Sequence, residues 1–501
     1  MVNGPSSQPN PGSFAIPAVA IASHPDVIRN LRDLRHWIDS LPLANPVKAG
    51  NLLLHQLRLL TRDPQPGTRF GALLDMYDAP LEQLLLIVNE RLPGGTDSSA
   101  LPLDQLESLL VELLTELACG HLRIANQSLL SGKAPATDTL FRAMRLLDSA
   151  LNIERLHYRR LALHRWQLMV SIFLRAEYQQ VADQQADPKL HSEGEPDTIR
   201  DLYFRTLLIS LCDPHHKIPS EVIAWHRWAT EHTGLLSITL LPEGAFAIPI
   251  DIGGTLSPLA SARRSGPGTD TRYLAADRFM QQLEEDPEAP AGLRQALIGL
   301  IKGRQTPEQR QTERQPRNHP YQLIYGLRNI HRRLEELTRG AAPGRSDVKP
   351  VPCRQVNQSR FGAAFQLRGP LSPPLNIGEP VLAEAEASSS NAAAVGFAAR
   401  IRRVFSGDDQ QIEIGVEKIQ GRLIPATIVG SATERTRGDN LALLQHSADT
   451  GKYTLLASRS IYREGESVAA EGPSMRYNLR MLRLGGIVQH AAYIDVEPIE
   501  G

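Results

Sequence analysis

The periodicity of apolar residues changes along the chain, and this change limits the possible fold more than any other feature. Between residues 24 and 234, apolar residues recur at steps of three and four, as in Leu103–Ile124 and Leu156–Val181, which is the pattern of amphipathic helices. From Val351 onward, short apolar runs alternate with turns of Gly, Pro, Asn and Asp, which is typical of strands in small barrels. The sequence therefore predicts a multidomain α+β protein.

The length supports several domains, because 501 residues exceed what one ordinary hydrophobic core organises. Shifts in composition and turn residues place the boundaries. We expect a flexible tail at 1–23, an all-α helical bundle at 24–234, a β-hairpin plus helical connector at 235–303, a β-barrel with a helical insertion at 304–430, and a further small β-domain at 431–501.

Charge and cysteine content exclude several classes of protein. The formal net charge is −1, so no overall charge draws the chain to a nucleic acid polymer. Cys119, Cys212 and Cys353 lie far apart, which favours reduced, buried thiols over a disulfide framework or a zinc site. No apolar run approaches the roughly 20 residues of a membrane span. Residues 1–23 carry no Lys or Arg and make a poor signal peptide, so we expect a cytoplasmic protein.

One short turn carries the strongest chemical signal. Asn357-Gln358-Ser359-Arg360-Phe361-Gly362 reads N-x-S-x-x-G and joins two strand-like runs. Asn and Ser side chains can bond a neighbouring backbone or the polar edge of a ligand, while Gly permits close backbone approach. Any turn built from these residue types would match, so the pattern needs its context.

The context is a basic segment upstream, Gly303–Asn318, which contains almost no apolar residues. Closely spaced guanidinium groups can bind phosphodiesters bidentately and stack on purines. Taken alone, such a run is more often a solvated linker. Its arginines are Arg304, Arg310, Arg314 and Arg317.

The arginine segment, the turn and the strands after them together resemble the PilZ domain family, a β-barrel module with which bacteria sense cyclic di-GMP. In that family an R-x-x-x-R segment before the first barrel strand holds phosphates and guanines, and a D/N-x-S-x-x-G turn surrounds one guanine. The resemblance covers about residues 304–430. It implies cyclic di-GMP as the ligand, bound by Arg310, Arg314, Arg317, Asn357, Ser359 and Gly362.

The second motif matches the family pattern, whereas the first departs from it. Arg310 and Arg314 form R-x-x-x-R a few residues too far from the strand expected at Tyr321–Tyr325. Arg317 is better placed, but Glu313 stands four residues before it. An insertion, Leu327–Pro350, separates the two motifs. Gly415 agrees with the family's habit of a Gly in a late barrel strand.

Other candidate sites favour structural roles. Asp251-Ile252-Gly253-Gly254-Thr255 resembles the D-x-G-x-T phosphate hairpin of actin-like ATPases, but no second phosphate loop accompanies it. His226 and His232 are six residues apart, a spacing that does not place two metal ligands on one helix face. We therefore expect no catalytic residue, no metal site and no cofactor.

The preferred interpretation is a bacterial cyclic di-GMP receptor that passes ligand binding to an unknown protein partner through its helical region. The alternative is a ligand-free PilZ-like scaffold that acts only through protein–protein contacts. Asn357, Ser359 and Gly362 favour the receptor, and the irregular arginine spacing favours the scaffold.

Overall fold

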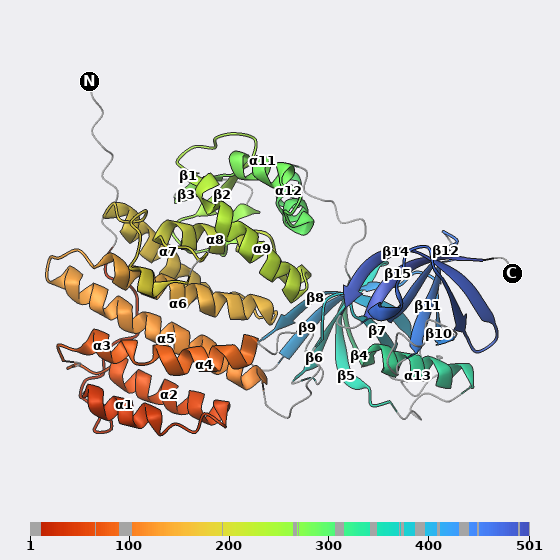
Figure 1. The fold of residues 1–501 in the computed structure, drawn as a ribbon, viewed down its shortest axis with the longest axis horizontal. Helices are drawn as coiled ribbons and strands as arrows, with labels where there is room; N and C mark the ends of the chain where they lie inside the picture. The colour runs from red at the N-terminus through yellow and green to blue at the C-terminus, as the bar shows by residue number, and fades with distance from the viewer. Residues whose placement is uncertain are drawn as a thin grey trace. The chain divides into compact units, whose positions relative to one another are not determined.

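The structure is a computed structural model that describes residues 12–65, 67–89, 103–192, 194–263, 268, 270–305, 315–340, 348–369, 371, 375–385, 396–407, 411–429, 440–447, 450–488 and 491–499. The chain divides into two compact units, which Figure 1 colours from red to green and from green to blue. The first unit takes Met1–Leu92, Asp97–Pro214 and Pro219–Glu308. The second takes Gln309–Gly501 with the short segments Pro93–Thr96 and His215–Ile218.

The first unit is built mainly from helices, as the apolar periodicity predicts. The longest helix, α5, packs against α2 on one side and α6 on the other (Figure 1). A Cβ on Gly120 of α5 would lie 2.9 Å from both terminal methyl carbons of Leu74, so a larger residue here would displace the Leu74 side chain of α3. The helices are α1 (Leu31–Asp39), α2 (Pro46–Thr61), α3 (Phe70–Asp75), α4 (Asp78–Asn89), α5 (Leu103–Leu130), α6 (Thr137–Leu156), α7 (Leu163–Tyr178), α8 (Ile199–Leu211) and α9 (Pro219–His232).

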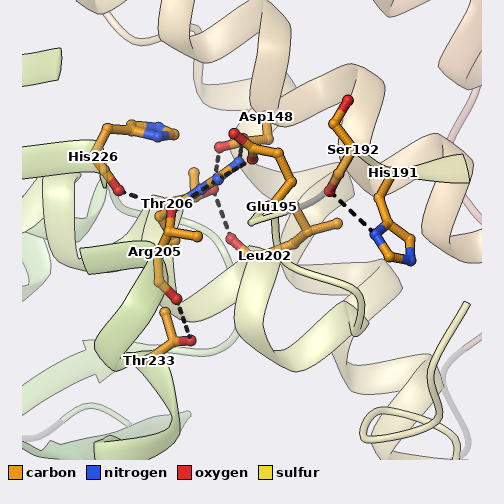
Figure 2. A network of polar contacts seen from close by, with 10 residues as sticks. Asp148, His191, Ser192, Glu195, Leu202, Arg205, Thr206, His226 and Thr233 are labelled. Carbon is orange, nitrogen blue, oxygen red and sulfur yellow. Dashed lines mark hydrogen bonds and ion pairs between the residues drawn. The ribbon is translucent and has the colours of Figure 1, made fainter. Parts of the chain in front are cut away.

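A buried polar network ties α6 to α8 and α9 (Figure 2). Arg205 of α8 donates to Asp148 Oδ2 at 2.6 Å, to Glu195 Oε2 at 2.5 Å and to Thr230 Oγ1 at 3.0 Å. Thr206 also donates to Asp148. Burial opposes ionisation of Asp148, but the attraction of Arg205 and Arg155 and the Thr206 hydrogen bond outweigh it, and the pKa of Asp148 falls to about 2.

A small sheet completes the first unit and differs from the expected hairpin. Strands β1 (Ser237–Thr239) and β2 (Ala247–Asp251) do not pair with each other, because β3 (Thr271–Ala275) lies between them and pairs antiparallel with both. The helices of the expected connector are α11 (Asp277–Glu285) and α12 (Ala291–Gln305), which follow β3. The short α10 (Pro258–Ala262) lies in the connection between β2 and β3.

The second unit contains two closed β-barrels, with strands at the positions where the alternating pattern predicts them. The first barrel has the order β4-β5-β6-β9-β8-β7, and the second has β10-β11-β12-β15-β14-β13. The strands of the first are β4 (Gln315–Tyr325), β5 (Val351–Gln358), β6 (Gly362–Arg368), β7 (Pro380–Ala385), β8 (Phe397–Ser406) and β9 (Gln411–Lys418). Those of the second are β10 (Arg422–Val429), β11 (Leu441–Ser447), β12 (Lys452–Ser458), β13 (Ser467–Glu471), β14 (Arg476–Val488) and β15 (Ala491–Pro498).

Two boundaries differ from those that we expected. Strand β4 begins at Gln315, inside the segment expected to be a linker, so Gln315–Asn318 is extended backbone. Strand β10 pairs with β11 and β13, so strand pairing divides the barrels before Arg422, one strand earlier than the expected division at residue 430. Composition did not reveal this, because the β9–β10 connection is only a few residues long.

The two barrels share an apolar junction with α13 (Leu327–Thr338). Ile330 of α13 packs in one buried cluster with Ile324 of the first barrel and Leu443 of the second. Hydrogen bonds also cross the junction, because the Tyr493 hydroxyl donates to the Gly378 carbonyl at 2.9 Å. Glu379, the next residue, is buried, and burial raises its pKa to about 7. The backbone amide of Asn376 donates a hydrogen bond to its carboxylate, which opposes this rise only in part.

We predict that Asp148→Asn lowers the free energy of unfolding of the helical unit by about 3–5 kcal/mol, because it removes the buried one of the two carboxylates that pair with Arg205. Urea unfolding followed by tryptophan fluorescence measures this, since all four tryptophans, Trp37, Trp166, Trp225 and Trp228, lie in the first unit. Asp183→Asn is the control, because its ion pair with Arg200 is exposed and should contribute about 1 kcal/mol or less. Equal effects of the two substitutions would contradict the proposed role of the network.

We predict that Glu379 makes the barrel unit less stable as the pH rises. Its folded pKa of about 7 exceeds the ordinary 4.5, so the folded state binds more protons than the unfolded state between these values. Stability should therefore decrease by up to about 3 kcal/mol from pH 4.5 to pH 7 through this group. Glu379→Gln should flatten that dependence in unfolding followed by circular dichroism. Glu466→Gln, at an exposed glutamate of the second barrel, should leave it unchanged.

Candidate ligand-binding site on the first barrel

The N-x-S-x-x-G motif forms the turn between β5 and β6. The Ser359 amide donates to the Gly362 carbonyl at 2.8 Å, and the Gly362 amide donates to Ser359 Oγ at 3.2 Å. A Cβ on Gly362 would lie 2.5 Å from the carbonyl oxygen of Val416, so no other residue fits against β9 here. Ser359 and Gly362 thus hold the shape of the turn.

Asn357 lies on the outer face of the barrel. Gln355 is buried in the interior, and an irregularity between Gln355 and Asn357 then turns Asn357 outward, opposite Ala364. Asn357 is half-buried, and among the described residues its side-chain amide makes no hydrogen bond of its own to protein. An outward amide with both donor and acceptor groups suits the edge of a guanine.

Arg317 lies beside Asn357 because of strand pairing. Strand β4 pairs Pro316 with Asn357, and a second irregularity, between Pro316 and His319, contains Arg317. The Arg317 side chain is exposed and donates to Gln315 Oε1 at 2.8 Å. The structure therefore brings one predicted arginine to the predicted turn, across 40 positions of sequence from Arg317 to Asn357.

Arg310 and Arg314 lie outside the described residues, so their predicted contacts stay predictions. The chain enters β4 at Gln315, directly after Arg314, and Gln315 pairs with Gln358 inside the turn motif.

Two arginines that the sequence analysis did not single out share this outer face. Arg354 points outward from β5 and is exposed, because its neighbours Cys353 and Gln355 point into the barrel. Arg403 of β8 pairs with Gly415 of β9, which in turn pairs with Ala364. Strand alternation could have indicated Arg354, but Arg403 follows an irregularity that no sequence pattern reveals.

Around the turn, aromatic and cationic groups lie close together. The Arg360 guanidinium carbon is 5.1 Å from the centre of the Phe361 ring, whose side chain is 38% exposed. Lys418 donates its backbone amide to the Phe361 carbonyl at 2.8 Å, and its ammonium lies 4.8 Å from the Phe397 ring. Burial lowers the pKa of Lys418. Cations, an amide and exposed ring surface suit a ligand that carries phosphates and purines.

The Asp251 side chain forms its hydrogen bonds within its own turn. The Asp251 carboxylate accepts from the Gly253 amide at 3.0 Å, the Thr255 hydroxyl at 2.7 Å and the Leu256 amide at 2.9 Å. Gly254 takes a positive φ of +67° against α7, where a Cβ would lie 3.3 Å from the Gln167 backbone. These contacts give the motif a structural role in the loop that follows β2.

The described residues contain neither a metal-ligand cluster nor a membrane-spanning helix. Within the described ranges, no group of three or more His, Cys, Asp or Glu side chains could hold a metal ion. Cys119, Cys212 and Cys353 are buried and form no disulfide, as expected. Of the helices in the described parts of the chain, none is long and apolar enough to cross a bilayer.

The helical unit resembles a known protein family. Residues 32–243 match the family model described as "Cyclic-di-GMP receptor FimW, N-terminal domain". The match runs from α1 to the loop after β1 and includes neither barrel. A search of curated proteins found no match. The helical unit is thus similar to the N-terminal domain of a cyclic di-GMP receptor.

Proposed function

We propose that the chain is a bacterial cyclic di-GMP receptor whose first barrel is a PilZ-like domain. The observation that carries this proposal is the pairing of Pro316 with Asn357, which places Arg317 at the N-x-S-x-x-G turn. The family match of the helical unit supports the same ligand through an independent part of the chain. The receptor would act in the cytoplasm, where bacteria use this messenger.

The chemistry of the ligand fits the residues around the turn. Cyclic di-GMP carries two phosphodiester charges and two guanines. Arg317, with Arg314 and Arg310 before it, would bind the phosphates and stack on a guanine. Asn357 would bond the edge of a guanine, while Ser359 and Gly362 keep the turn in shape for that contact. None of these roles is catalytic, so the proposal is a binding protein without enzyme activity.

The second candidate is a ligand-free scaffold. It rests on the irregular arginine motif, in which Glu313 stands four residues before Arg317 where an arginine would complete R-x-x-x-R. A carboxylate at that position would repel phosphate. Binding measurements separate the two candidates.

We predict that Asn357→Ala and Arg317→Ala each weaken cyclic di-GMP binding about tenfold or more. Losing one hydrogen bond to a charged or buried group costs about 1.5–3 kcal/mol. The double variant Arg314→Ala/Arg317→Ala should lose more. Isothermal titration calorimetry on the full chain measures these affinities. Arg422→Ala is the matched control, because Arg422 is an exposed arginine at the start of the corresponding first strand of the second barrel.

Two results would count against the receptor. No heat of binding for the wild-type chain would favour the scaffold. Wild-type affinity in the Arg314→Ala/Arg317→Ala variant, together with wild-type affinity in Asn357→Ala, would leave the nucleotide bound at a different place.

We also propose that ligand binding changes the helical unit and through it the binding of a protein partner. Such transmission requires that the ligand favour one state of the protein over another. All four tryptophans lie in the helical unit, so their fluorescence reports on it alone. We expect saturating cyclic di-GMP to shift the tryptophan-detected urea midpoint of the wild type but not of Asn357→Ala. An unchanged midpoint in the wild type would mean binding without transmission.

A further inference from the structure

The second barrel has the same strand order as the first barrel. Replacing each strand of β4-β5-β6-β9-β8-β7 by the strand six places later gives β10-β11-β12-β15-β14-β13, the order of the second barrel. Six strands permit many closed orders, so the shared order indicates two copies of one module rather than a barrel followed by an unrelated domain.

Local details repeat as well. Gly378 and Gly465 stand before β7 and β13 with φ of +84° and +76°. The Gly378 amide donates to the Ile401 carbonyl at 2.8 Å, and the Gly465 amide donates to the Met481 carbonyl at 2.8 Å. The return bonds, from Ile401 to Glu379 and from Met481 to Glu466, are both 2.9 Å. Because the two sets of hydrogen bonds match, Ile401 and Met481 are equivalent positions in the two barrels.

The alignment continues into an irregularity of pairing that both barrels share. In the first barrel the register shifts between Ile401 and Arg403, and in the second between Met481 and Arg483. Arg403 therefore corresponds to Arg483. The strands opposite them read Ile414-Gly415-Val416-Glu417 and Ile494-Asp495-Val496-Glu497. The two copies thus differ at one informative position, where Gly415 corresponds to Asp495.

This difference changes the surroundings of the arginine. In the second barrel Arg483 donates to Asp495 Oδ2 at 2.8 and 3.2 Å, so a carboxylate on the facing strand neutralises it. In the first barrel the facing residue has no side chain, and the Arg403 chain lies across it: a Cβ on Gly415 would be 3.5 Å from Arg403 Cβ and 3.8 Å from its Nε. The Arg403 guanidinium instead forms an ion pair at 3.0 Å with Glu413, which also lies on β9 but two residues from Gly415, and its central carbon is 4.7 Å from the centre of the Phe405 ring.

Strand register places Arg403 in line with the proposed site. One row across the outer face of the first barrel runs through Pro316, Asn357, Ala364, Gly415 and Arg403. Three strand spacings, about 14 Å, separate Asn357 from Arg403. The same row of the second barrel holds Leu423, Gln445, Thr454, Asp495 and Arg483. Only the first of these two rows combines an asparagine with an arginine whose carboxylate partner, Glu413, lies outside the row.

We propose that Arg403 is a further ligand-binding residue at the far side of the site, and that the second barrel is a copy that does not bind the nucleotide. This inference rests on the proposed function. Arg403 would contact a phosphate or a guanine face from the side opposite Asn357, over the space that Gly415 leaves. In the second barrel, Asp495 occupies that space, engages Arg483 and repels phosphate. One binding site per chain follows.

The test replaces Gly415 and Asp495, in separate variants of the full chain, each by the residue that the other barrel carries. Gly415→Asp gives the first barrel the pair that the second barrel carries, so the fold should tolerate it, while cyclic di-GMP affinity should fall at least about tenfold. Asp495→Gly is the matched control and should leave affinity and stoichiometry unchanged. Arg403→Ala and Arg403→Gln should weaken binding similarly, whereas Arg483→Ala should not. Circular dichroism and the melting temperature verify folding, and the Arg403 variants decide the question where Gly415→Asp does not fold.

The outcomes distinguish this inference from the proposed function. No binding by the wild type overturns both. Binding that is lost in Asn357→Ala but retained in Gly415→Asp and both Arg403 variants overturns only the role of Arg403. A second nucleotide-binding site that disappears in Arg483→Ala overturns the inference that the second barrel does not bind the nucleotide.

Discussion

The pairing of β4 with β5 is the interaction on which the second unit and its candidate site depend. The last five residues of β4, Tyr321–Tyr325, also pair with β7, and this closes the first barrel. Among the described residues, the first half of the strand pairs with β5 alone and lies along the turn motif. One strand therefore performs two tasks: its second half completes the hydrophobic interior, and its first half brings Arg317 to the Asn357 turn. Because backbone hydrogen bonds fix this register, the placement of Arg317 does not depend on a flexible loop.

Because the barrel is duplicated, the candidate site of the first barrel can be compared with the equivalent positions of the second barrel. Both copies keep the features that closure requires, including a glycine with positive φ before the fourth strand and the register shift in the fifth. They differ where a ligand would be bound and where the copies meet. Glu379 shows the second kind of difference, because it is buried at the junction while Glu466, its counterpart, is exposed. Features shared by the copies therefore belong to folding, and features confined to one copy are candidates for function.

Sequence patterns predicted the helical unit, the positions of the barrel strands and the turn at Asn357, because all of these depend on local periodicity and turn chemistry. They failed where the outcome depends on which strands pair. The strand Thr271–Ala275 was missed, so β1 and β2 were expected to pair with each other. The second barrel was expected only as a small β-domain, because β10 was assigned to the first. Arg403 could not be found for the same reason: its place beside Gly415 follows from a register shift that leaves no trace in alternation.

The central claim is that the first barrel, and neither the helical unit nor the second barrel, holds the nucleotide. Hydrogen exchange of the full chain, measured by mass spectrometry with and without cyclic di-GMP, tests it most directly. We expect the strongest protection on peptides covering Gln315–Pro320 and Arg354–Gly362, with little change in Leu441–Ser458 of the second barrel. Strongest protection within residues 32–243 or in the second barrel, with the Asn357 turn unchanged, would contradict it.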